Sequence, residues 1–326
     1  MKAILCKEYG PADTLVIEDV PSPEAKGRGV KVRVRAAGLN FPDTLIIENK
    51  YQIKPPLPFS PGGEMAGEVI AVGDQVTRFK PGDRVAGLTG YGAFAEEVIV
   101  PEQNLLPVPD AMSDEKAAAF TMVYGTSYYA LKQRANLQPG ETLLVLGASG
   151  GVGLATVELG KAMGARVIAA ASSADKLAIA QAAGADEVIN YSEENLKDAA
   201  KRLTNSKGVD VIYDPVGGEY TEQALRAMAW NGRHLIIGFA AGDIPKIPAN
   251  LTLLKGCSVV GVFWGDFTRR EPEVSAQNMV DLMGLFAEGK IDPKISAVYP
   301  FEDYAQALGA LTGRKATGKV VLKVGG

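Results

Sequence analysis

Residues that coordinate metals or form disulfide bonds are scarce in this sequence. Its 326 residues include a single histidine, His234, and two cysteines, Cys6 and Cys257. Two cysteines cannot form a structural zinc site of four cysteines, and two thiols so far apart in sequence are expected to be buried and reduced. This usage favours a reducing compartment, and we expect the protein in the cytoplasm. His234 opens an expected strand, where a structural role is expected rather than a catalytic one.

Long hydrophobic runs and an excess of basic residues are also missing. The first residues, M-K-A-I-L-C-K-E-Y-G, contain too short an apolar stretch for a signal-peptide core, and no run reaches the length of a transmembrane helix. The formal charge is -4, with acidic and basic residues interleaved, so no basic face for nucleic acid is expected. We therefore expect neither a membrane nor a nucleic acid as a partner.

A glycine-rich turn between an expected strand and an expected helix is the most informative segment. Residues 142–146 are β-branched or leucine-rich, which is typical of a strand buried on both faces of a parallel sheet. The turn differs from G-x-G-x-x-G in having Ala148 at the first position, when Gly150 and Gly153 are aligned with the last two. Free N–H groups at the start of the helix would bind an anion. The residues expected to hold a dinucleotide pyrophosphate are Ser149, Gly150, Gly151 and Val152.

Further strands follow this turn, with helical spacing in most of the gaps between them. They are expected at residues 166–171, 187–190, 209–214, 233–238 and 257–263. Together with residues 142–146 they predict a doubly wound, six-stranded parallel sheet that binds a dinucleotide. A glycine-rich turn alone can be purely structural, so the nucleotide site is inferred from the turn and this context together.

The first 118 residues or so have short strands, prolines and glycines, and little helical periodicity. This composition predicts an all-β or barrel-like domain. Strands are expected at 2–7, 14–19, 30–37, 64–72, 84–87 and 93–100, and helices at 115–131, 274–288 and 304–311. Residues 40–61 form a long irregular segment, a kind of loop that is often functional.

The last expected strand, residues 319–324, fits the N-terminal domain better than the completed parallel sheet. We therefore expect a discontinuous catalytic domain formed by residues 1–118 and 264–326. The dinucleotide-binding domain is expected at residues 119–263.

Several motifs, in order along the whole chain, resemble the medium-chain dehydrogenase/reductase superfamily. They are A-A-G-L-N-F-P-D at 36–43, P-G-G-E-M-A-G-E-V at 61–69, G-D-R-V at 82–85, G-T-S-Y-Y at 125–129, the glycine turn, G-A-D-E-V-I-N-Y at 184–191 and G-K-V-V-L at 318–322. Within this superfamily the chain is most similar to the zinc-free quinone oxidoreductase branch. The resemblance implies a Rossmann domain and a GroES-like catalytic domain.

The resemblance also bears on zinc. Alcohol dehydrogenases of the superfamily bind zinc through Cys, His and Cys, and the corresponding positions here are Asn40, Gly63 and Met122. These three residues are not a plausible ligand set for zinc. We therefore expect no metal in the reaction.

The end of the second parallel strand indicates which cofactor is bound. Sheets that prefer NAD usually have Asp or Glu there to bind the ribose 2′-hydroxyl, and the aligned residue here is Ala171. The resemblance implies that the 2′-phosphate of NADPH is bound by Ser172, Ser173, Lys176, Tyr191 and Arg314. We expect NADPH rather than NADH. The alternative is that Ser173 only caps a helix.

The resemblance further implies that Asn40, Tyr51 and Thr126 surround the nicotinamide and the substrate, and that Phe239 and Phe263 line the crevice. Related bacterial enzymes have a second tyrosine in the loop, where Leu45 stands here. Tyr51 is the candidate proton donor by residue type, although it could also be an ordinary loop tyrosine. Asp43 is expected to fix the turn after Asn40 rather than to transfer a proton.

These observations predict an NADPH-dependent reductase that transfers a hydride to a small electrophile, with a quinone as the first choice. A 2-enoyl-CoA or acryloyl-CoA thioester and an α,β-unsaturated ketone are alternatives, because an apolar pocket separates such substrates poorly. An NADPH-binding structural protein with little turnover is the alternative from another class. The apolar sixth strand would lie at a sheet edge, which predicts a homodimer.

Overall fold

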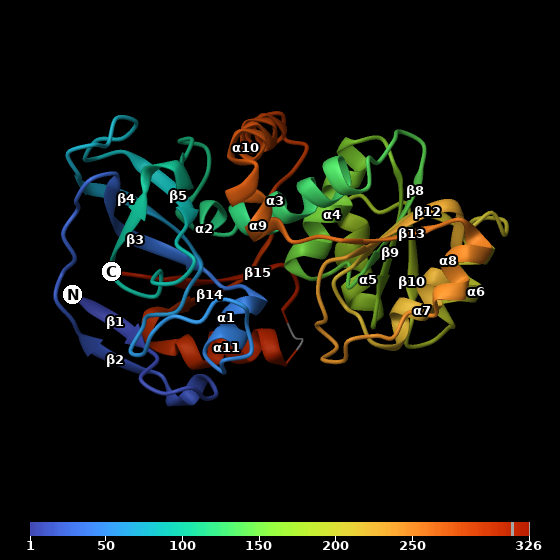
Figure 1. Ribbon diagram of the computed structural model, residues 1–326, viewed down its shortest axis with the longest axis horizontal. Helices are drawn as coiled ribbons and strands as arrows, with labels where there is room; N and C mark the ends of the chain where they lie inside the picture. The colour runs from blue at the N-terminus through green and yellow to red at the C-terminus, as the bar shows by residue number, and fades with distance from the viewer. Residues whose placement is uncertain (314–315, 326) are drawn as a thin grey trace. The chain divides into compact units, whose positions relative to one another are not determined.

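The computed structural model describes residues 1–313 and 316–325 of the chain. The chain forms two compact units, Met1–Met122 with Pro293–Gly326 and Val123–Asp292, which are drawn in Figure 1. Both ends of the chain therefore contribute to the first unit. Residues 264–292 were expected in this unit, whereas the structure places them in the second.

The helices of residues 264–292 belong to the second unit because they pack on α3 (Thr121–Tyr129). Tyr129 stacks on Phe267 of α9 (Trp264–Arg270), with the ring centroids 4.0 Å apart. Stacked aromatic rings bury a large apolar area, which holds α9 on α3. The helical pattern in the sequence indicates a helix here but does not indicate which unit the helix packs on.

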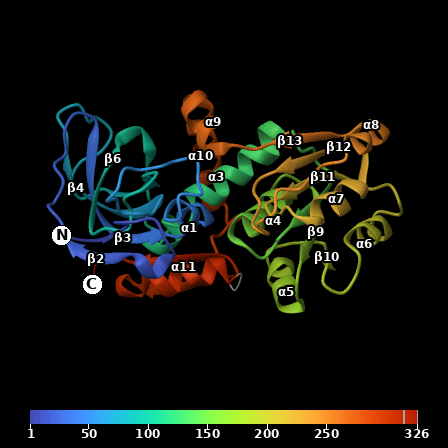
Figure 2. The same ribbon diagram turned by 60° about the horizontal axis from the view of Figure 1, so that its bottom comes forward.

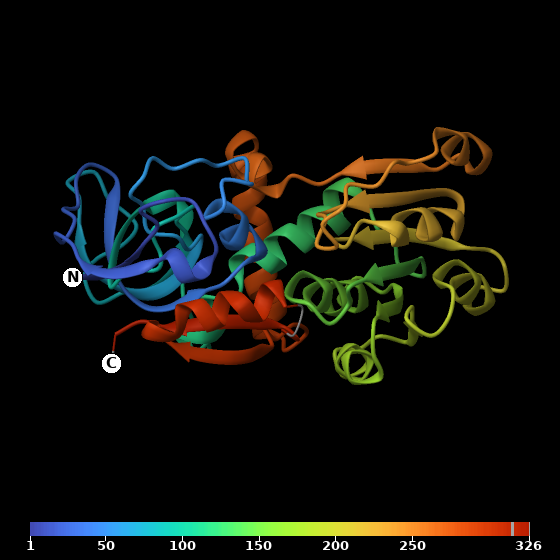
Figure 3. The same cartoon turned by 90° about the horizontal axis from the view of Figure 1, so that it is seen from below.

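A six-stranded parallel sheet lies at the centre of the second unit. Its strands, in spatial order, are β10 (Glu187–Asn190), β9 (Arg166–Ala171), β8 (Thr142–Leu146), β11 (Val209–Asp214), β12 (Met228–Ile236) and β13 (Ser258–Gly261). All neighbouring strands in this sheet are parallel. The order is that of a doubly wound dinucleotide-binding sheet, so the expected fold is confirmed. Figure 3 shows β13, in orange, at one edge of the sheet.

Two of these strands differ from their expected ranges. β12 begins at Met228, so His234 lies inside the strand, and the expectation that it opens the strand is wrong. β13 covers only Ser258–Gly261, so Phe263 follows the strand and Cys257 precedes it. Both cysteines are free and buried, as expected.

Helices connect the parallel strands and cover both faces of the sheet (Figure 2). They are α4 (Gly151–Ala162), α5 (Ala174–Ala182), α6 (Leu196–Leu203), α7 (Glu219–Arg226) and α8 (Ala249–Lys255). As a result all five residues of the central strand β8 are buried, which explains its uninterrupted apolar sequence. Among the described residues, no helix is long and apolar enough to cross a membrane.

The first unit contains a seven-stranded sheet and a separate two-stranded one. The larger sheet has the order β14 (Ile295–Pro300), β15 (Lys319–Lys323), β3 (Gly29–Gly38), β4 (Glu64–Val72), β5 (Arg84–Leu88) and β7 (Leu105–Pro107), with β6 (Glu97–Pro101) also paired to β3. The smaller sheet pairs β1 (Lys2–Leu5) with β2 (Val16–Asp19). β15 pairs with β3, so the last strand lies in the first unit as the sequence predicted. β7 and β14 were not predicted.

The segment expected to be irregular, residues 40–61, begins with a short helix, α1 (Phe41–Ile46). The prolines around this helix obscured it in the sequence, although Pro42 in fact stands in its first turn, where proline is well tolerated. The other helices are α2 (Asp114–Ala117), α10 (Pro272–Ala287) and α11 (Tyr304–Thr312), which lie within or close to expected helices.

Candidate active site

The glycine turn after β8 has the geometry of an anion site. Gly150 is the N-cap residue of α4 and provides no side-chain cap, so the first N–H groups of the helix have no partner within it. A Cβ atom at Gly153 would lie 2.3 Å from the carbonyl oxygen of Gly147, so only glycine lets α4 pack this closely on the turn. The sequence-predicted residues Ser149, Gly150, Gly151 and Val152 form this turn and the start of α4.

The end of β9 lacks an acidic side chain. The strand ends at Ala171, which is buried, and is followed by Ser172 and Ser173. The ammonium group of Lys176, on α5, donates to the hydroxyl of Ser172 at 3.2 Å. Ser173 is the N-cap residue of α5 but makes no side-chain cap hydrogen bond. The structure therefore brings Ser172 and Lys176 together, and Ser173 does not make the capping bond considered from the sequence.

Of the remaining residues predicted around the cofactor, Tyr191 is half-buried after β10. Its ring lies against Tyr220, with the centroids 4.4 Å apart, and no sequence motif indicated this second tyrosine. Phe239 is half-buried after β12, whereas Phe263 is 55% exposed after β13. Arg314 lies outside the described residues.

A buried hydroxyl network holds α3 against the first turn of α4. The hydroxyl of Thr156 donates to the carbonyl oxygen of Val152 at 2.7 Å and lies 3.0 Å from the hydroxyl of Ser127. Ser127 is also 3.0 Å from the hydroxyl of Tyr213 on β11. Thr126, one of the predicted site residues, is next to Ser127 on α3 and is half-buried. The network therefore ties the helix that contains Thr126 to the helix that begins at the glycine turn.

His234, the single histidine, is buried in the second unit beside a carboxylate. Its Nε2 atom lies 3.1 Å from Oδ2 of Asp214, and both side chains are buried. Asp214 also accepts hydrogen bonds from the hydroxyl of Thr221 and from the backbone N–H groups of Val216 and Gly217. Burial opposes ionisation of Asp214, but the hydrogen bond from His234 and these other donors keep its pKa below the ordinary value. The pair thus anchors the loop that follows β11.

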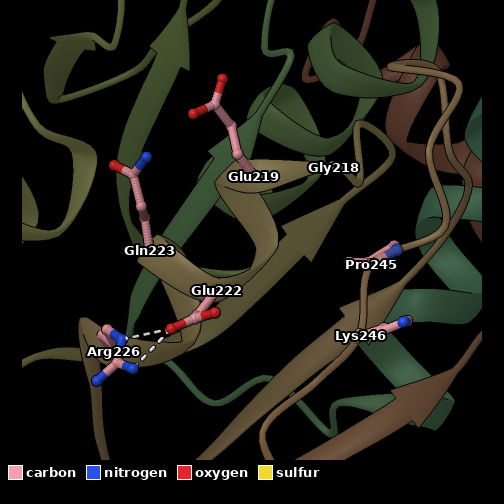
Figure 4. Close-up of a pocket in the computed structure, with 7 residues that line it drawn as sticks. All are labelled: Gly218, Glu219, Glu222, Gln223, Arg226, Pro245 and Lys246. Atoms are coloured by element: carbon pink, nitrogen blue, oxygen red, sulfur yellow. Dashed lines mark hydrogen bonds and ion pairs between the residues drawn. The ribbon is translucent and has the colours of Figure 1, made fainter.

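A separate hollow of about 290 Å³ lies beside α7 in the second unit, as Figure 4 shows. Its lining residues are Gly218, Glu219, Glu222, Gln223, Arg226, Pro245 and Lys246. Glu222 and Arg226 pair across one turn of the helix at 2.6 Å. None of the predicted site residues that the structure describes lines this hollow.

In the first unit, Asp43 joins the start of α1 to the loop before β4. Its Oδ2 atom accepts the backbone N–H of Asn40 at 2.7 Å, and its Oδ1 atom accepts that of Gly63 at 3.1 Å. These contacts are what the predicted turn-fixing role requires. Burial raises the pKa of Asp43 to about 7, against the effect of the Asn40 N–H and the positive charge of Lys319.

Asn40 lies in a buried polar cluster with Glu64 and Lys319, which the sequence did not single out. The ammonium group of Lys319 donates to Asn40 Oδ1 at 2.7 Å and lies 3.2 Å from Glu64 Oε2. The other oxygen of Glu64 accepts the backbone N–H of Met122 at 2.8 Å. Glu64 and Lys319 both occur in motifs that indicated the family, but nothing in those motifs showed that they meet.

The three positions that bind zinc in alcohol dehydrogenases do not fit that metal here. Asn40 is already held by Lys319, and Gly63 has no side chain. The methyl group of Met122 lies 3.4 Å from the point that a Cβ atom of Gly63 would occupy. Among the described residues, no group of three His, Cys, Asp or Glu side chains is arranged to hold a metal ion.

Tyr51, the predicted proton donor, is half-buried in the first unit and packs against its core. Burial raises the pKa of its phenol, and the negative charge of Asp43 raises it further. The phenol therefore keeps its proton at neutral pH. Leu45, at the position of the second tyrosine of related enzymes, is half-buried on α1.

The pH dependence of stability provides a test of the Asp43 environment. Its pKa is about 7 in the folded protein and 3.8 ordinarily, so the folded state binds more protons between these values. The contribution of Asp43 to the free energy of unfolding is therefore complete below about pH 4 and is lost as the pH rises to 7. Between pH 5 and 8 the wild type should lose on the order of 2 kcal/mol more unfolding free energy than Asp43→Asn. Urea unfolding at both pH values measures this difference. Asp13→Asn, which changes an exposed carboxylate, is the control. If the unfolding free energies of wild type and Asp43→Asn change equally with pH, the raised pKa of Asp43 is wrong.

Comparisons with known proteins agree with this architecture. Residues 26–110 match the family described as the alcohol dehydrogenase GroES-like domain, and residues 151–283 match the family described as zinc-binding dehydrogenase. The chain is 44% identical over 325 residues to a quinone oxidoreductase-like protein 2 homolog of Nematostella vectensis, covering 98% of this chain and 88% of that protein.

Solved structures of related proteins agree with these sequence comparisons. A quinone oxidoreductase of Pseudomonas syringae has a TM-score of 0.92 and 35% identity, with 99% of each chain covered. An Escherichia coli quinone oxidoreductase complexed with NADPH has a TM-score of 0.92 and 30% identity, covering 99% of this chain and 100% of that one. The chain therefore belongs to the zinc-free quinone oxidoreductase branch of the medium-chain dehydrogenase/reductase superfamily and is an NAD(P)H-dependent oxidoreductase.

Proposed function

We propose that the chain is an NADPH-dependent quinone reductase that works without zinc. The observation that supports it most strongly is the end of β9, where Ala171 replaces an acid and the ammonium of Lys176 lies 3.2 Å from the hydroxyl of Ser172. An acid at this point would repel a 2′-phosphate, whereas an ammonium and a hydroxyl bind it. Ser173 and Tyr191 are proposed as further contacts, and Arg314 as another from outside the described residues.

The second unit would hold the cofactor through its backbone as well. The N–H groups at the start of α4 bind the pyrophosphate, and the hydroxyl network of Ser127, Thr156 and Tyr213 keeps α3 in place beside them. When bound, NADPH supplies a hydride from C4 of its nicotinamide. Phe239 and Phe263 give the crevice apolar walls in this proposal, and Thr126 offers a hydroxyl near the reacting ring.

Reduction of a quinone places negative charge on an oxygen atom, which a hydrogen-bond donor must meet. Tyr51 suits this role because its raised pKa keeps the phenol protonated at neutral pH. A quinone accepts a hydride without Lewis-acid help, since its product oxyanion is already well stabilised. This chemistry agrees with Asn40, Gly63 and Met122, which do not suit zinc at the positions that bind it in alcohol dehydrogenases.

We further propose that the protein is a homodimer. β13 is an edge strand, and Val259 on it is 37% exposed. Three other large apolar side chains of the same unit are exposed as well, Trp230 at 70%, Leu253 at 79% and Leu254 at 70%. An unpaired apolar edge favours pairing with a second copy of the chain. We also propose a cytoplasmic location, which suits the two free buried thiols.

The cofactor assignment predicts the effect of two substitutions. Lys176→Ala should raise KM for NADPH by about tenfold or more and leave KM for NADH nearly unchanged, because one charge-assisted contact to the 2′-phosphate is lost. Ala171→Asp should shift preference toward NADH. Steady-state kinetics with both cofactors measures the ratio of kcat/KM for NADPH to kcat/KM for NADH. If both variants keep the wild-type ratio, the proposed 2′-phosphate site is wrong.

The substrate class is tested by following NADPH oxidation with 1,4-benzoquinone, 9,10-phenanthrenequinone and crotonyl-CoA, each with and without EDTA. We expect turnover of the quinones that survives the chelator. Tyr51→Phe should lower kcat by about a hundredfold or more, the range of a lost proton donor. Crotonyl-CoA turnover with inert quinones would instead indicate an enoyl-thioester reductase, and NADPH binding without turnover would indicate a binding protein.

The dimer is tested by light scattering at micromolar concentration. The wild type should have the mass of two chains, and Val259→Lys should have the mass of one, because a charge on the edge strand opposes strand pairing. Lys323→Met on β15 is a control that should stay dimeric. A monomeric wild type at this concentration would refute the proposal.

A further inference from the structure

We propose that Lys319 is a positioning residue that fixes the side-chain amide of Asn40, so that Asn40 meets its ligand as a hydrogen-bond acceptor. The inference rests on the proposed function and on the expectation, from the family resemblance, that Asn40 lies beside the nicotinamide and the substrate. Lys319 is part of the G-K-V-V-L motif, to which the proposed function assigns no role.

All three hydrogen atoms of the Lys319 ammonium group have acceptors. They point to the carbonyl oxygen of Leu39 at 2.8 Å, to Asn40 Oδ1 at 2.7 Å and to Glu64 Oε2 at 3.2 Å. Asn40 and Lys319 are each only 5% exposed, and Glu64 is fully buried. An ammonium group can donate but cannot accept, so only the oxygen end of the Asn40 amide can face it. Lys319 therefore determines which way the amide points.

The nitrogen end of the amide is engaged as well. Asn40 Nδ2 donates to the carbonyl oxygen of Gly38 at 3.3 Å and to Glu64 Oε2 at 3.1 Å. Both of its hydrogen atoms are thereby used, so the side chain has no donor left to offer a ligand, and Oδ1 is its one acceptor atom. A ligand of Asn40 must therefore bring an N–H or O–H donor, such as the carboxamide of a nicotinamide or the hydroxyl of a reduced quinone. The resemblance implied only that Asn40 lies near the nicotinamide and the substrate, whereas this geometry indicates that Asn40 accepts a hydrogen bond there.

Strand pairing explains how residue 319 reaches residue 40. Val321 is opposite Gly38 in the antiparallel pair of β15 and β3, and the N–H of Leu39 donates to the carbonyl oxygen of Val320 at 2.9 Å. One step further along, Lys319 lies beside Asn40. Gly318 has a φ of +97°, and a Cβ atom there would lie 2.5 Å from the carbonyl oxygen of Lys294, so glycine is required where β15 begins.

Stability alone does not account for an ammonium group in this place. A buried ion pair usually gains little over apolar residues of similar volume, because both charges lose their hydration. Removing only one partner is costly, since the other charge is left unpaired. The test must therefore remove both charges together, which Glu64→Gln with Lys319→Met does. The carboxamide that Glu64→Gln introduces keeps an oxygen that can still accept the N–H of Met122.

The experiment compares this double variant with Asn40→Ala and with the triple variant that combines all three substitutions. We expect the double variant to lower kcat with the quinone by tenfold or more relative to Glu64→Gln alone, and Asn40→Ala to do the same. Adding the double change to Asn40→Ala should cost less than twofold further, because the positioned group is already absent. Lys319→Arg, which keeps a cation and its donors, should stay within about threefold of wild type. Lys323→Met, on the exposed end of the same strand, is the matched control.

The proposal is overturned if kcat of the double variant stays within twofold of that of Glu64→Gln. It is also overturned if the triple variant loses kcat by the product of the losses in the double variant and in Asn40→Ala. Thermal unfolding gives a second readout that needs no turnover. Lys319→Met should lower the melting temperature by several degrees more with Asn40 present than with alanine there, and equal shifts would refute the link. If no acceptor is reduced at all, the proposed function fails, while this thermal cycle still decides whether Lys319 holds Asn40.

Discussion

The antiparallel pairing of β15 with β3 is the contact on which the first unit depends. It joins the last strand of the chain to a strand near its beginning and brings β14 into the same sheet. It also delivers an ammonium group to the buried end of β3, where Asn40 and Glu64 meet it. The complete sheet and the polar cluster therefore contain residues from both ends of the sequence.

Burial changes the acidity of two groups in the first unit, Asp43 and Tyr51. Asp43 loses water on folding, and its pKa rises to about 7 although two backbone N–H groups and Lys319 favour the charged form. The same surroundings raise the pKa of the Tyr51 phenol. The Tyr51 phenol and the Asn40 amide both belong to the first unit, and in the proposed function they act as proton donor and hydrogen-bond acceptor. Quinone reduction suits this arrangement, since it needs a hydrogen-bond donor more than a Lewis acid.

The second unit relies on close packing at one turn. Gly153 lets α4 approach the carbonyl oxygen of Gly147, and α4 begins there with N–H groups that have no partner within the helix. The hydroxyls of Ser127, Thr156 and Tyr213 then hold α3 against α4 from inside the core. These hydroxyls are buried and find hydrogen-bond partners in one another within the core.

The sequence by itself determined the features that depend on local patterns. The parallel strands, the glycine turn and the missing acid at Ala171 all follow from neighbouring residues, because side-chain periodicity and backbone sterics act over a few positions. Tertiary structure alone decided the rest. The helices of residues 264–292 joined the second unit through the Tyr129–Phe267 stack, and His234 proved to lie inside β12 beside Asp214. Lys319 met Asn40 across a separation of 279 residues. No local pattern encodes such a contact, since it exists only once strand pairing has fixed the register.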